Sequence, residues 1–162
     1  MRALARLIGT WFFLGYVPKA PGTAGSLGAI AIAWWLHTYA GVPPAGFAVY
    51  ASLLLAPASW AAGRVAQDTG KKDPQIVVVD EVVGQWITLA GASALTWKSW
   101  ILAFLLFRAF DIWKPPPVRQ LERIPGGPGI VFDDAMAGIY AALVLYAAGW
   151  FNSISAFLYG IS

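Results

Sequence analysis

Long apolar stretches separated by short polar ones dominate the pattern of this chain. Across 20–63 there is no Asp, Glu, Lys or Arg, and the pair Pro43-Pro44 divides this stretch. Two consecutive prolines end a helix and favour a turn. The pattern therefore predicts a helical hairpin with arms at 23–40 and 45–62, each about 18 residues long and just able to cross a bilayer.

The remainder of the chain continues this alternation. A second apolar run is interrupted at Lys98, which predicts two short helices at 82–96 and 100–113. The last part of the chain carries no charge and predicts one more helix at 135–151. We therefore expect a single domain over 1–162, with an all-α fold: an integral membrane bundle of about five short transmembrane helices.

Composition agrees with a membrane setting. The chain is 59% hydrophobic and only 12% charged, whereas soluble domains carry about a quarter charged residues. The net charge of +3 is not arranged as a basic stripe on a hydrophilic body, which excludes the usual nucleic-acid binder. The absence of cysteine excludes a thiolate metal site and a cysteine-nucleophile phosphatase.

The charges sort the polar segments by side of the membrane. If the N-terminus lies inside, the regions 1–22, 63–81 and 108–134 face the cytoplasm and hold every Lys and Arg except Lys98. This asymmetry follows the positive-inside rule, which does not govern acids. Yet all the acids fall in the same regions: Asp68, Asp73, Asp80, Glu81, Asp111, Glu122, Asp133 and Asp134. Their one-sided placement indicates a function on the cytoplasmic side.

Two adjacent carboxylate pairs stand where predicted helices begin. Asp80-Glu81 precedes the third predicted helix, and Asp133-Asp134 precedes the last. Carboxylates suit a helix start because they face the positive end of its dipole. They also bind hard cations through oxygen. Taken alone, each pair is compatible with a helix cap or with a metal site.

Arg108, Asp111 and Lys114 are spaced three apart at the end of the fourth predicted helix. This spacing places them on adjoining turns, where they form either a local salt bridge or an Asp metal ligand flanked by two cations. Arg and Lys are the side chains that bind phosphate, so the second interpretation points to a phosphorylated substrate.

The glycine-rich segment 21–26 opens the first predicted helix. Free N–H groups at such a start bind anions, and Lys19 is close enough to share one. The alternative is that Thr23 and Ser26 pack between helices. No Walker A pattern occurs. His37 is the only histidine and falls near the opposite end, so a histidine triad is excluded and a structural role is expected.

Three acidic clusters at one side of the bundle would repel one another if helix packing brought them together. A bound divalent cation would make such a cluster stable. The sequence therefore predicts a metal site built from the following carboxylates: Asp80, Glu81, Asp111, Asp133 and Asp134.

Four motifs in this order resemble the phosphatidylglycerophosphatase A family: Pro21-Gly22-Thr23-x-Gly25-Ser26, Asp80-Glu81-x-x-Gly84-x-Trp86-Ile87-Thr88, Phe107-Arg108-x-x-Asp111-x-Trp113-Lys114-Pro115-x-Pro117, and Gly126-Gly127-x-Gly129-Ile130-x-x-Asp133-Asp134-x-x-Ala137-Gly138. The resemblance spans about 9–150. It implies a multi-pass enzyme of the bacterial inner membrane, with its active site on the cytoplasmic side. It also implies an Mg²⁺-dependent phosphoric monoester hydrolase of phospholipid biosynthesis, which converts phosphatidylglycerophosphate to phosphatidylglycerol. One departure is the loop 71–75, which lacks a histidine that family members often carry.

On this resemblance the five carboxylates would hold one or two Mg²⁺ ions. The residues expected to bind the substrate phosphate are Lys19, Thr23, Ser26, Arg108 and Lys114. The attacking group is either water or an Asp. The expected partners are the bilayer and the lipid substrate, without nucleic acid, and nothing in the sequence indicates the oligomeric state.

Two other functions compete with this interpretation. An ion-coupled transporter would also use intramembrane carboxylates, but no internal repeat is visible and the acids stand at helix ends. An enzyme that transfers lipid headgroups from a cytidine diphosphate alcohol would need the run D-x-x-D-G-x-x-A-R, which is absent.

Overall fold

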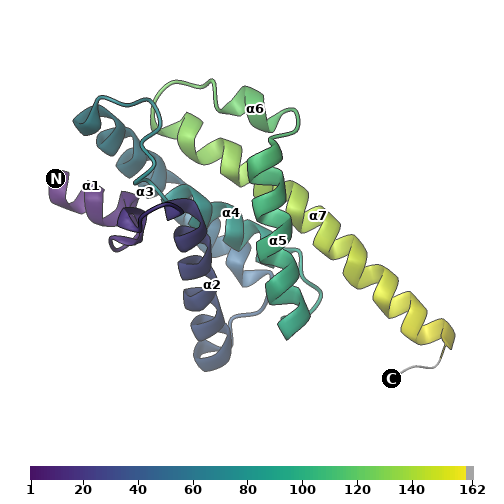
Figure 1. Cartoon of the computed structure of the whole chain (residues 1–162). Helices are drawn as coiled ribbons and strands as arrows, with labels where there is room; N and C mark the ends of the chain where they lie inside the picture. Colours follow the sequence, from purple (N-terminus) through teal and green to yellow (C-terminus); the bar gives the residue numbers. More distant parts are fainter. Residues whose placement is uncertain (160–162) are drawn as a thin grey trace.

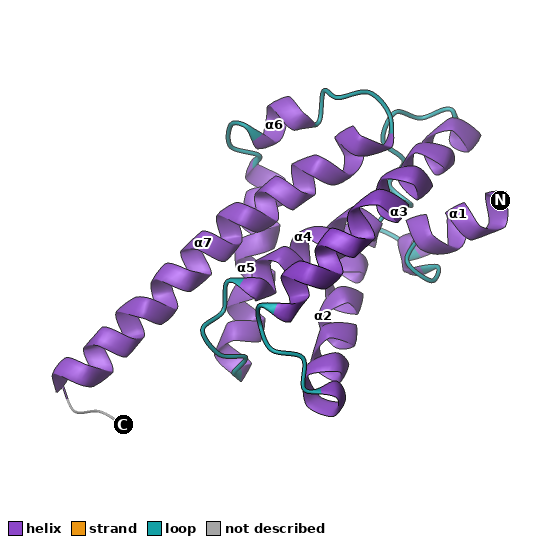
Figure 2. Cartoon of the chain, turned by 180° about the vertical axis from the view of Figure 1, so that it is seen from behind, coloured by secondary structure: helices purple, strands orange, loops and turns teal. Residues whose placement is uncertain are grey.

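The computed structural model describes residues 1–159, and the side chains of residues 1–151. In this part of the chain every regular element is helical and no strand occurs, which confirms the all-α prediction (Figures 1 and 2). The elements are α1 (Arg2–Gly9), the short 3₁₀ helix η1 (Leu14–Tyr16), α2 (Pro21–Ala40), α3 (Gly46–Thr69), α4 (Val79–Ala90), α5 (Trp97–Trp113), α6 (Val118–Leu121) and α7 (Gly127–Tyr159).

Helix α4 is the centre of the bundle. It packs against α2, α3, α5 and α7, which surround it in Figure 1. Its apolar side chains are buried on nearly every side, including Val79, Val82, Val83 and Leu89, all with no exposed surface. A helix that is apolar all round is stable only when other elements cover it completely. The first turn of α4 therefore has a fixed position relative to four neighbouring helices.

Two glycines allow α4 and α7 to cross with their backbones in contact. A methyl group at Gly138 would overlap with the carbonyl oxygen of Gly84, and one at Gly84 would overlap with the ring of Phe107. Small residues at such crossings let helix backbones approach closely. The same approach brings the start of α4 beside the second turn of α7, where Asp134 lies.

The predicted number of transmembrane helices is wrong. Each predicted helix has a counterpart in α2, α3, α4, α5 or α7, but within the described residues only two are long and apolar enough to cross a membrane: Gly46–Thr69 and Gly127–Phe151. A span needs about 20 apolar residues, whereas α4 has 12 and α5 has 17. Helix α2 has 20 residues, but polar and glycine residues near its ends lower its hydropathy.

The start of the last helix also differs from its prediction. Helix α7 begins at Gly127 rather than near residue 135, so Asp133 and Asp134 lie in its second turn and not before its start. The sequence Gly-Gly-Pro-Gly favours a turn, but proline is tolerated in the first turn of a helix. Gly127 packs so closely on α3 that a methyl group would overlap with the carbonyl of Ser59. Because of this tertiary contact, the segment forms the start of a helix.

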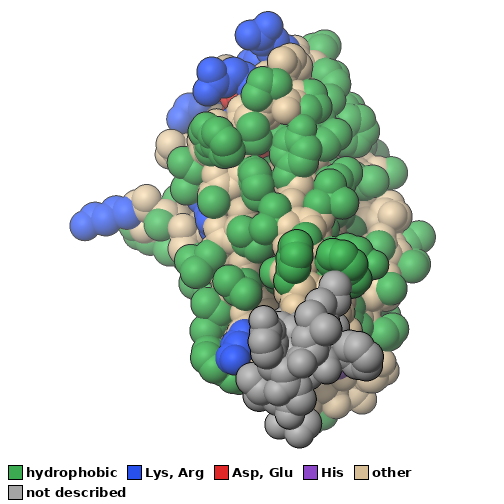
Figure 3. All heavy atoms as spheres, turned by 90° about the vertical axis from the view of Figure 1, so that its right-hand side faces the viewer, with side chains coloured by type: hydrophobic (Ala, Val, Ile, Leu, Met, Phe, Trp, Pro, Cys, Tyr) green, Lys and Arg blue, Asp and Glu red, His purple; other side chains and the backbone are tan. Residues whose placement is uncertain are grey.

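The outer surface suits a lipid environment. On the face shown in Figure 3, hydrophobic side chains cover the middle, and Lys and Arg gather at its upper end. Large apolar side chains point outward from α5 and α7, among them Leu105, Leu143 and Tyr146, which are 54 to 63% exposed. An apolar surface of this extent marks contact with a membrane or partner. Together with the two candidate spans, it supports a membrane protein.

Candidate active site

All the predicted site residues except Ser26 line one open cavity of about 600 Å³. Segments from several parts of the chain meet there: the first turn of α2 with the stretch 15–20 before it, the first turn of α4 with the loop before it, the last turn of α5, and the second turn of α7. No single stretch of the chain contains all of these segments. The cavity is therefore a product of helix packing.

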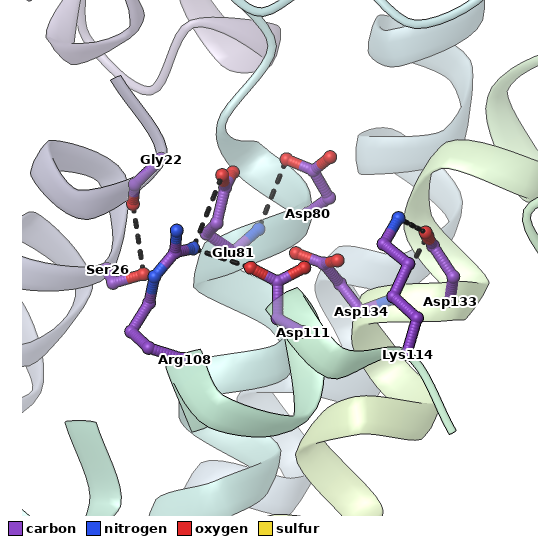
Figure 4. Close-up of polar contacts among 9 residues, drawn as sticks. All are labelled: Gly22, Ser26, Asp80, Glu81, Arg108, Asp111, Lys114, Asp133 and Asp134. Carbon is purple, nitrogen blue, oxygen red and sulfur yellow. Dashed lines mark hydrogen bonds and ion pairs between the residues drawn. The ribbon is translucent and has the colours of Figure 1, made fainter. Parts of the chain in front are cut away.

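Three carboxylates from two helices converge on this cavity. Asp80 and Glu81 come from α4 and Asp134 comes from α7, and one oxygen of each lies within 4.8 Å of the others. Asp80 and Asp134 are only 7% and 5% exposed. Figure 4 shows the three side chains pointing toward one another. Groups of this kind, oxygen-rich and close together, match the ligand preference of hard divalent cations.

Local contacts fix the two acids of α4. The N–H of Val78, just before the helix, donates to the carbonyl of Gly9 over 2.8 Å, which anchors the helix start. The N–H of Glu81 donates to Asp80 Oδ1 over 3.1 Å. Across the cavity, Gly22 of α2 lies so close to Glu81 Oε1 that a methyl group there would overlap with it. Glycine thus lets α2 approach Glu81 without displacing its carboxylate.

The other two predicted carboxylates are each paired with a cation. Arg108 Nη1 lies 2.7 Å from Asp111 Oδ2 and 3.9 Å from Glu81 Oε1. Lys114 Nζ lies 2.8 Å from Asp133 Oδ2, as Figure 4 also shows. The ion pairs hold both cations at the cavity wall. Arg108 retains further N–H donors for a substrate, since a guanidinium has five.

The electrostatics of the cavity show how strongly its acids interact. Burial raises the pKa of Asp80 well above its ordinary value, and the charges of Glu81 and Asp134 raise it further. Burial would lower the pKa of Lys114, but its hydrogen bond and attraction to Asp133, with help from Glu122, outweigh this effect and raise it. The cavity therefore holds a firmly charged ammonium group beside carboxylates that repel one another.

A divalent cation fits this donor set. Glu81 Oε2 is buried and has no hydrogen-bond partner among the described residues. An unpartnered buried oxygen is costly, and a bound cation would satisfy it while offsetting the repulsion among Asp80, Glu81 and Asp134. The residues that would hold an ion are these three. Asp111 and Asp133 lie beside them but are engaged by Arg108 and Lys114.

The predicted phosphate-binding residues of the α2 region differ in position. Thr23 lies in the first turn of α2 and lines the cavity, and Lys19 lines its rim with an exposed side chain. Ser26 does not line it: this residue is completely buried, and its hydroxyl donates to the carbonyl of Gly22 over 3.0 Å. Helix α2 begins with proline, and the next two residues, Gly22 and Thr23, line the cavity. The N–H groups of these residues have no partner within the helix, because they belong to its first turn.

One charged residue of the cavity was absent from the predicted site. Asp73 lines the cavity from the loop before α4 with an exposed side chain. The sequence placed Asp73 with the other acids on one side of the membrane. Asp73 has no acidic neighbour in its loop, so no motif marked it as a site residue.

His37 lies outside the cavity. Its ring nitrogen Nδ1 donates to the carbonyl of Val42 over 2.8 Å, between α2 and α3.

Comparison with known proteins shows the family to which the sequence belongs. The model of the family "Phosphatidylglycerophosphatase A" matches residues 7–149. The chain belongs to the phosphatidylglycerophosphatase A family. The match covers all the helices that contribute to the cavity and confirms the resemblance drawn from the four sequence motifs.

Named bacterial relatives of the family cover most of the chain. A phosphatidylglycerophosphatase A of Escherichia coli is 37% identical over 88% of this chain and 82% of its own length. One of Haemophilus influenzae is 38% identical over 87% and 86%. A Bacteroides thetaiotaomicron protein, provisionally named a phosphatidylinositol-3-phosphatase, is 41% identical over 89% and 92%. No solved structure matches the chain significantly. Nothing in these comparisons supports the transporter alternative.

Proposed function

We propose that this protein is an Mg²⁺-dependent phosphatase that removes the terminal phosphate of phosphatidylglycerophosphate, giving phosphatidylglycerol and inorganic phosphate. The observation that carries the proposal is the convergence of Asp80, Glu81 and Asp134 in a cavity that three cationic side chains also line. The family and two of its named relatives supply the substrate. The site would serve phospholipid synthesis in a bacterial inner membrane.

In this proposal each part of the cavity has a separate role. Asp80, Glu81 and Asp134 would hold the metal, which supplies Lewis-acid stabilisation of charge on phosphoryl oxygens when bound. Arg108 and Lys114 would bind the same phosphate and offset its charge. The start of α2 would donate hydrogen bonds from its free N–H groups and from Thr23. Lys19, at the rim, would attract the anionic headgroup.

We infer that water is the attacking group rather than one of the five predicted carboxylates. A carboxylate nucleophile must be free to approach phosphorus, but all five predicted carboxylates have another task. Asp111 and Asp133 are held by Arg108 and Lys114 at 2.7 and 2.8 Å. The remaining three would form the metal-binding group. Water, by contrast, reaches the cavity directly because the cavity is open.

Metal removal and phosphate release test the proposed reaction. The purified protein in detergent micelles should release phosphate from phosphatidylglycerophosphate with Mg²⁺, lose this activity in excess chelator, and recover it when Mg²⁺ is restored. The physical reason is that Asp80, Glu81 and Asp134 repel one another and cannot bind an anionic phosphate without a cation. Undiminished release in chelator would refute the metal requirement. No release with Mg²⁺, together with cation flux in vesicles, would refute the phosphatase.

A further inference from the structure

A second hollow lies next to the catalytic cavity and shares Lys114 with it. This basic hollow has a volume of about 220 Å³ and is also lined by Arg119 and Arg123. Both arginines are exposed, and within the described part of the chain neither side chain has an ion pair or hydrogen bond to another residue. Two unpaired guanidinium groups beside an active site favour binding of an anion.

An apolar groove continues from the basic hollow. It has a volume of about 360 Å³ and shares Trp113, Pro115 and Pro116 with the hollow. Its remaining lining residues are aromatic or aliphatic: Phe110, Tyr140, Leu143 and Val144. Leu143 and Val144 belong to the stretch of α7 that is apolar enough to cross a membrane. The groove therefore runs from the basic hollow along the stretch of α7 that is a candidate membrane span.

The walls of the groove are held in place. The hydroxyl of Tyr140 donates to the carbonyl of Pro116 over 2.8 Å, which ties the segment after α5 to α7. The ring of Phe110 lies 5.7 Å from that of Tyr140 and stacks on Trp113 at 6.4 Å. Aromatic pairs at these distances stabilise each other. A ligand would enter a groove that already has its shape.

We propose that the basic hollow binds the inner phosphodiester of the lipid substrate, and that the groove binds one of its acyl chains. This inference rests on the proposed function, because it starts from a terminal phosphate bound in the catalytic cavity. In phosphatidylglycerophosphate a single glycerol joins the terminal phosphate to the phosphodiester, to which the diacylglycerol is attached. Cavity, basic hollow and groove follow in the same order, and Lys114 and then Trp113 mark the two junctions.

The proposal also explains what different lipid substrates would share. The names of the relatives refer to phosphatidylglycerophosphate and to phosphatidylinositol 3-phosphate. Both lipids carry a phosphomonoester on a polyol that is joined to diacylglycerol by a phosphodiester. A site that recognises the phosphodiester and an acyl chain would accept either lipid and select against phosphatidate, which has no phosphodiester.

Binding of the product tests the inference without turnover. Dihexanoyl phosphatidylglycerol keeps the phosphodiester and acyl chains but lacks the terminal phosphate. Titration calorimetry should show that Arg119→Ala/Arg123→Ala weakens its binding by about 10-fold, the loss expected for charge-assisted hydrogen bonds. The matched control is Arg64→Ala/Lys71→Ala, which removes the same charge from the end of α3 and the next loop and should bind normally. Dihexanoylglycerol, which has no phosphate, should bind all three proteins equally.

Turnover gives a second readout. The Arg119→Ala/Arg123→Ala variant should raise KM for phosphatidylglycerophosphate about 10-fold with little change in kcat, because the lost contacts are distant from the reacting phosphate. Its kcat/KM for phosphatidate should equal that of the wild type. Filling the groove by Val144→Trp should raise KM for the long-chain lipid more than for its dihexanoyl analogue.

Equal product binding by the wild type and the arginine variant would overturn the inference. So would an equal loss in the Arg64→Ala/Lys71→Ala control, because that result would show only general attraction to an anionic surface. Failure of the proposed function would give a different result: the wild-type protein would bind phosphatidylglycerol but release no phosphate from phosphatidylglycerophosphate.

Discussion

At the scale of the residue, the site divides its five carboxylates into two groups. Asp80, Glu81 and Asp134 face one another, whereas Asp111 and Asp133 face cations. Substitutions that remove charge but preserve shape should therefore have different effects in the two groups. The difference is measurable as dependence on metal concentration rather than as activity alone.

Asp134→Asn tests the metal-binding group. Loss of one carboxylate ligand should lower turnover at least about 100-fold and raise the Mg²⁺ concentration needed for half-maximal activity. Circular dichroism should show an intact helical fold, because the amide has the same size as the carboxylate. Asp68→Asn is the control: Asp68 pairs with Arg2 at 3.5 Å, does not line the cavity, and should remain fully active. Normal metal dependence in Asp134→Asn would exclude this residue as a ligand.

Asp111→Asn tests the paired group. This change removes the partner that holds Arg108 at 2.7 Å, so substrate phosphate should bind in a poorer geometry and turnover should fall about 10-fold or more. The half-maximal Mg²⁺ concentration should stay at the wild-type value. A large increase in that concentration would instead place Asp111 among the metal ligands.

Which acids group together could not be predicted from the sequence. The spacing of Arg108, Asp111 and Lys114 predicted their common position at the end of one helix, and Arg108 does pair with Asp111. The spacing could not show that Lys114 pairs with Asp133 instead, because that contact depends on how α5 packs against α7. Likewise Ser26 fits an anion-binding motif by position, but the packing of α2 buries it.

At the scale of the element, the glycine crossing of α4 and α7 determines the distance between Asp80 and Asp134. Gly138→Ala should force the two backbones apart, because its methyl group would overlap with backbone atoms of Gly84. Overpacking of this kind costs about 1–3 kcal/mol of unfolding free energy. Thermal denaturation should show the loss, and half-maximal Mg²⁺ should rise because two ligands separate.

Gly28→Ala is the matched control for this crossing. Its new methyl group would overlap only with the end of the Leu14 side chain, which can rotate away. The variant should keep wild-type metal dependence. If Gly138→Ala also kept both its stability and its metal dependence, the close crossing would not control the site.

Helices that depend on local pattern were predictable, and those that depend on tertiary contact were not. Pro43-Pro44 and the charge-free arms correctly indicated α2 and α3. The prediction for α4 was wrong. Its apolar composition predicted a membrane span, but neighbouring helices rather than lipid cover it. A buried core helix and a short span have the same composition, so only length and packing separate them.

At the scale of the whole molecule, all but one of the basic residues belong to the segments predicted to be cytoplasmic, and Lys98 lies alone at the start of α5. In Figure 1 the start of α5 and the segment that contains α6 lie at opposite ends of the molecule. The positive-inside rule predicts that the end with α6, and with it the cavity, faces the cytoplasm.

Single cysteines can measure this orientation because the chain contains none of its own. Lys71 and Lys98 are both exposed, and neither lines the catalytic cavity. In spheroplasts, a maleimide that cannot cross membranes should label Lys98→Cys directly, but should label Lys71→Cys only after permeabilisation. Both variants should retain phosphatase activity, and the cysteine-free parent should stay unlabelled. The reverse labelling pattern would place the cavity, and with it Arg108 and Lys114, on the outer side, where a cytoplasmic role in lipid synthesis is impossible.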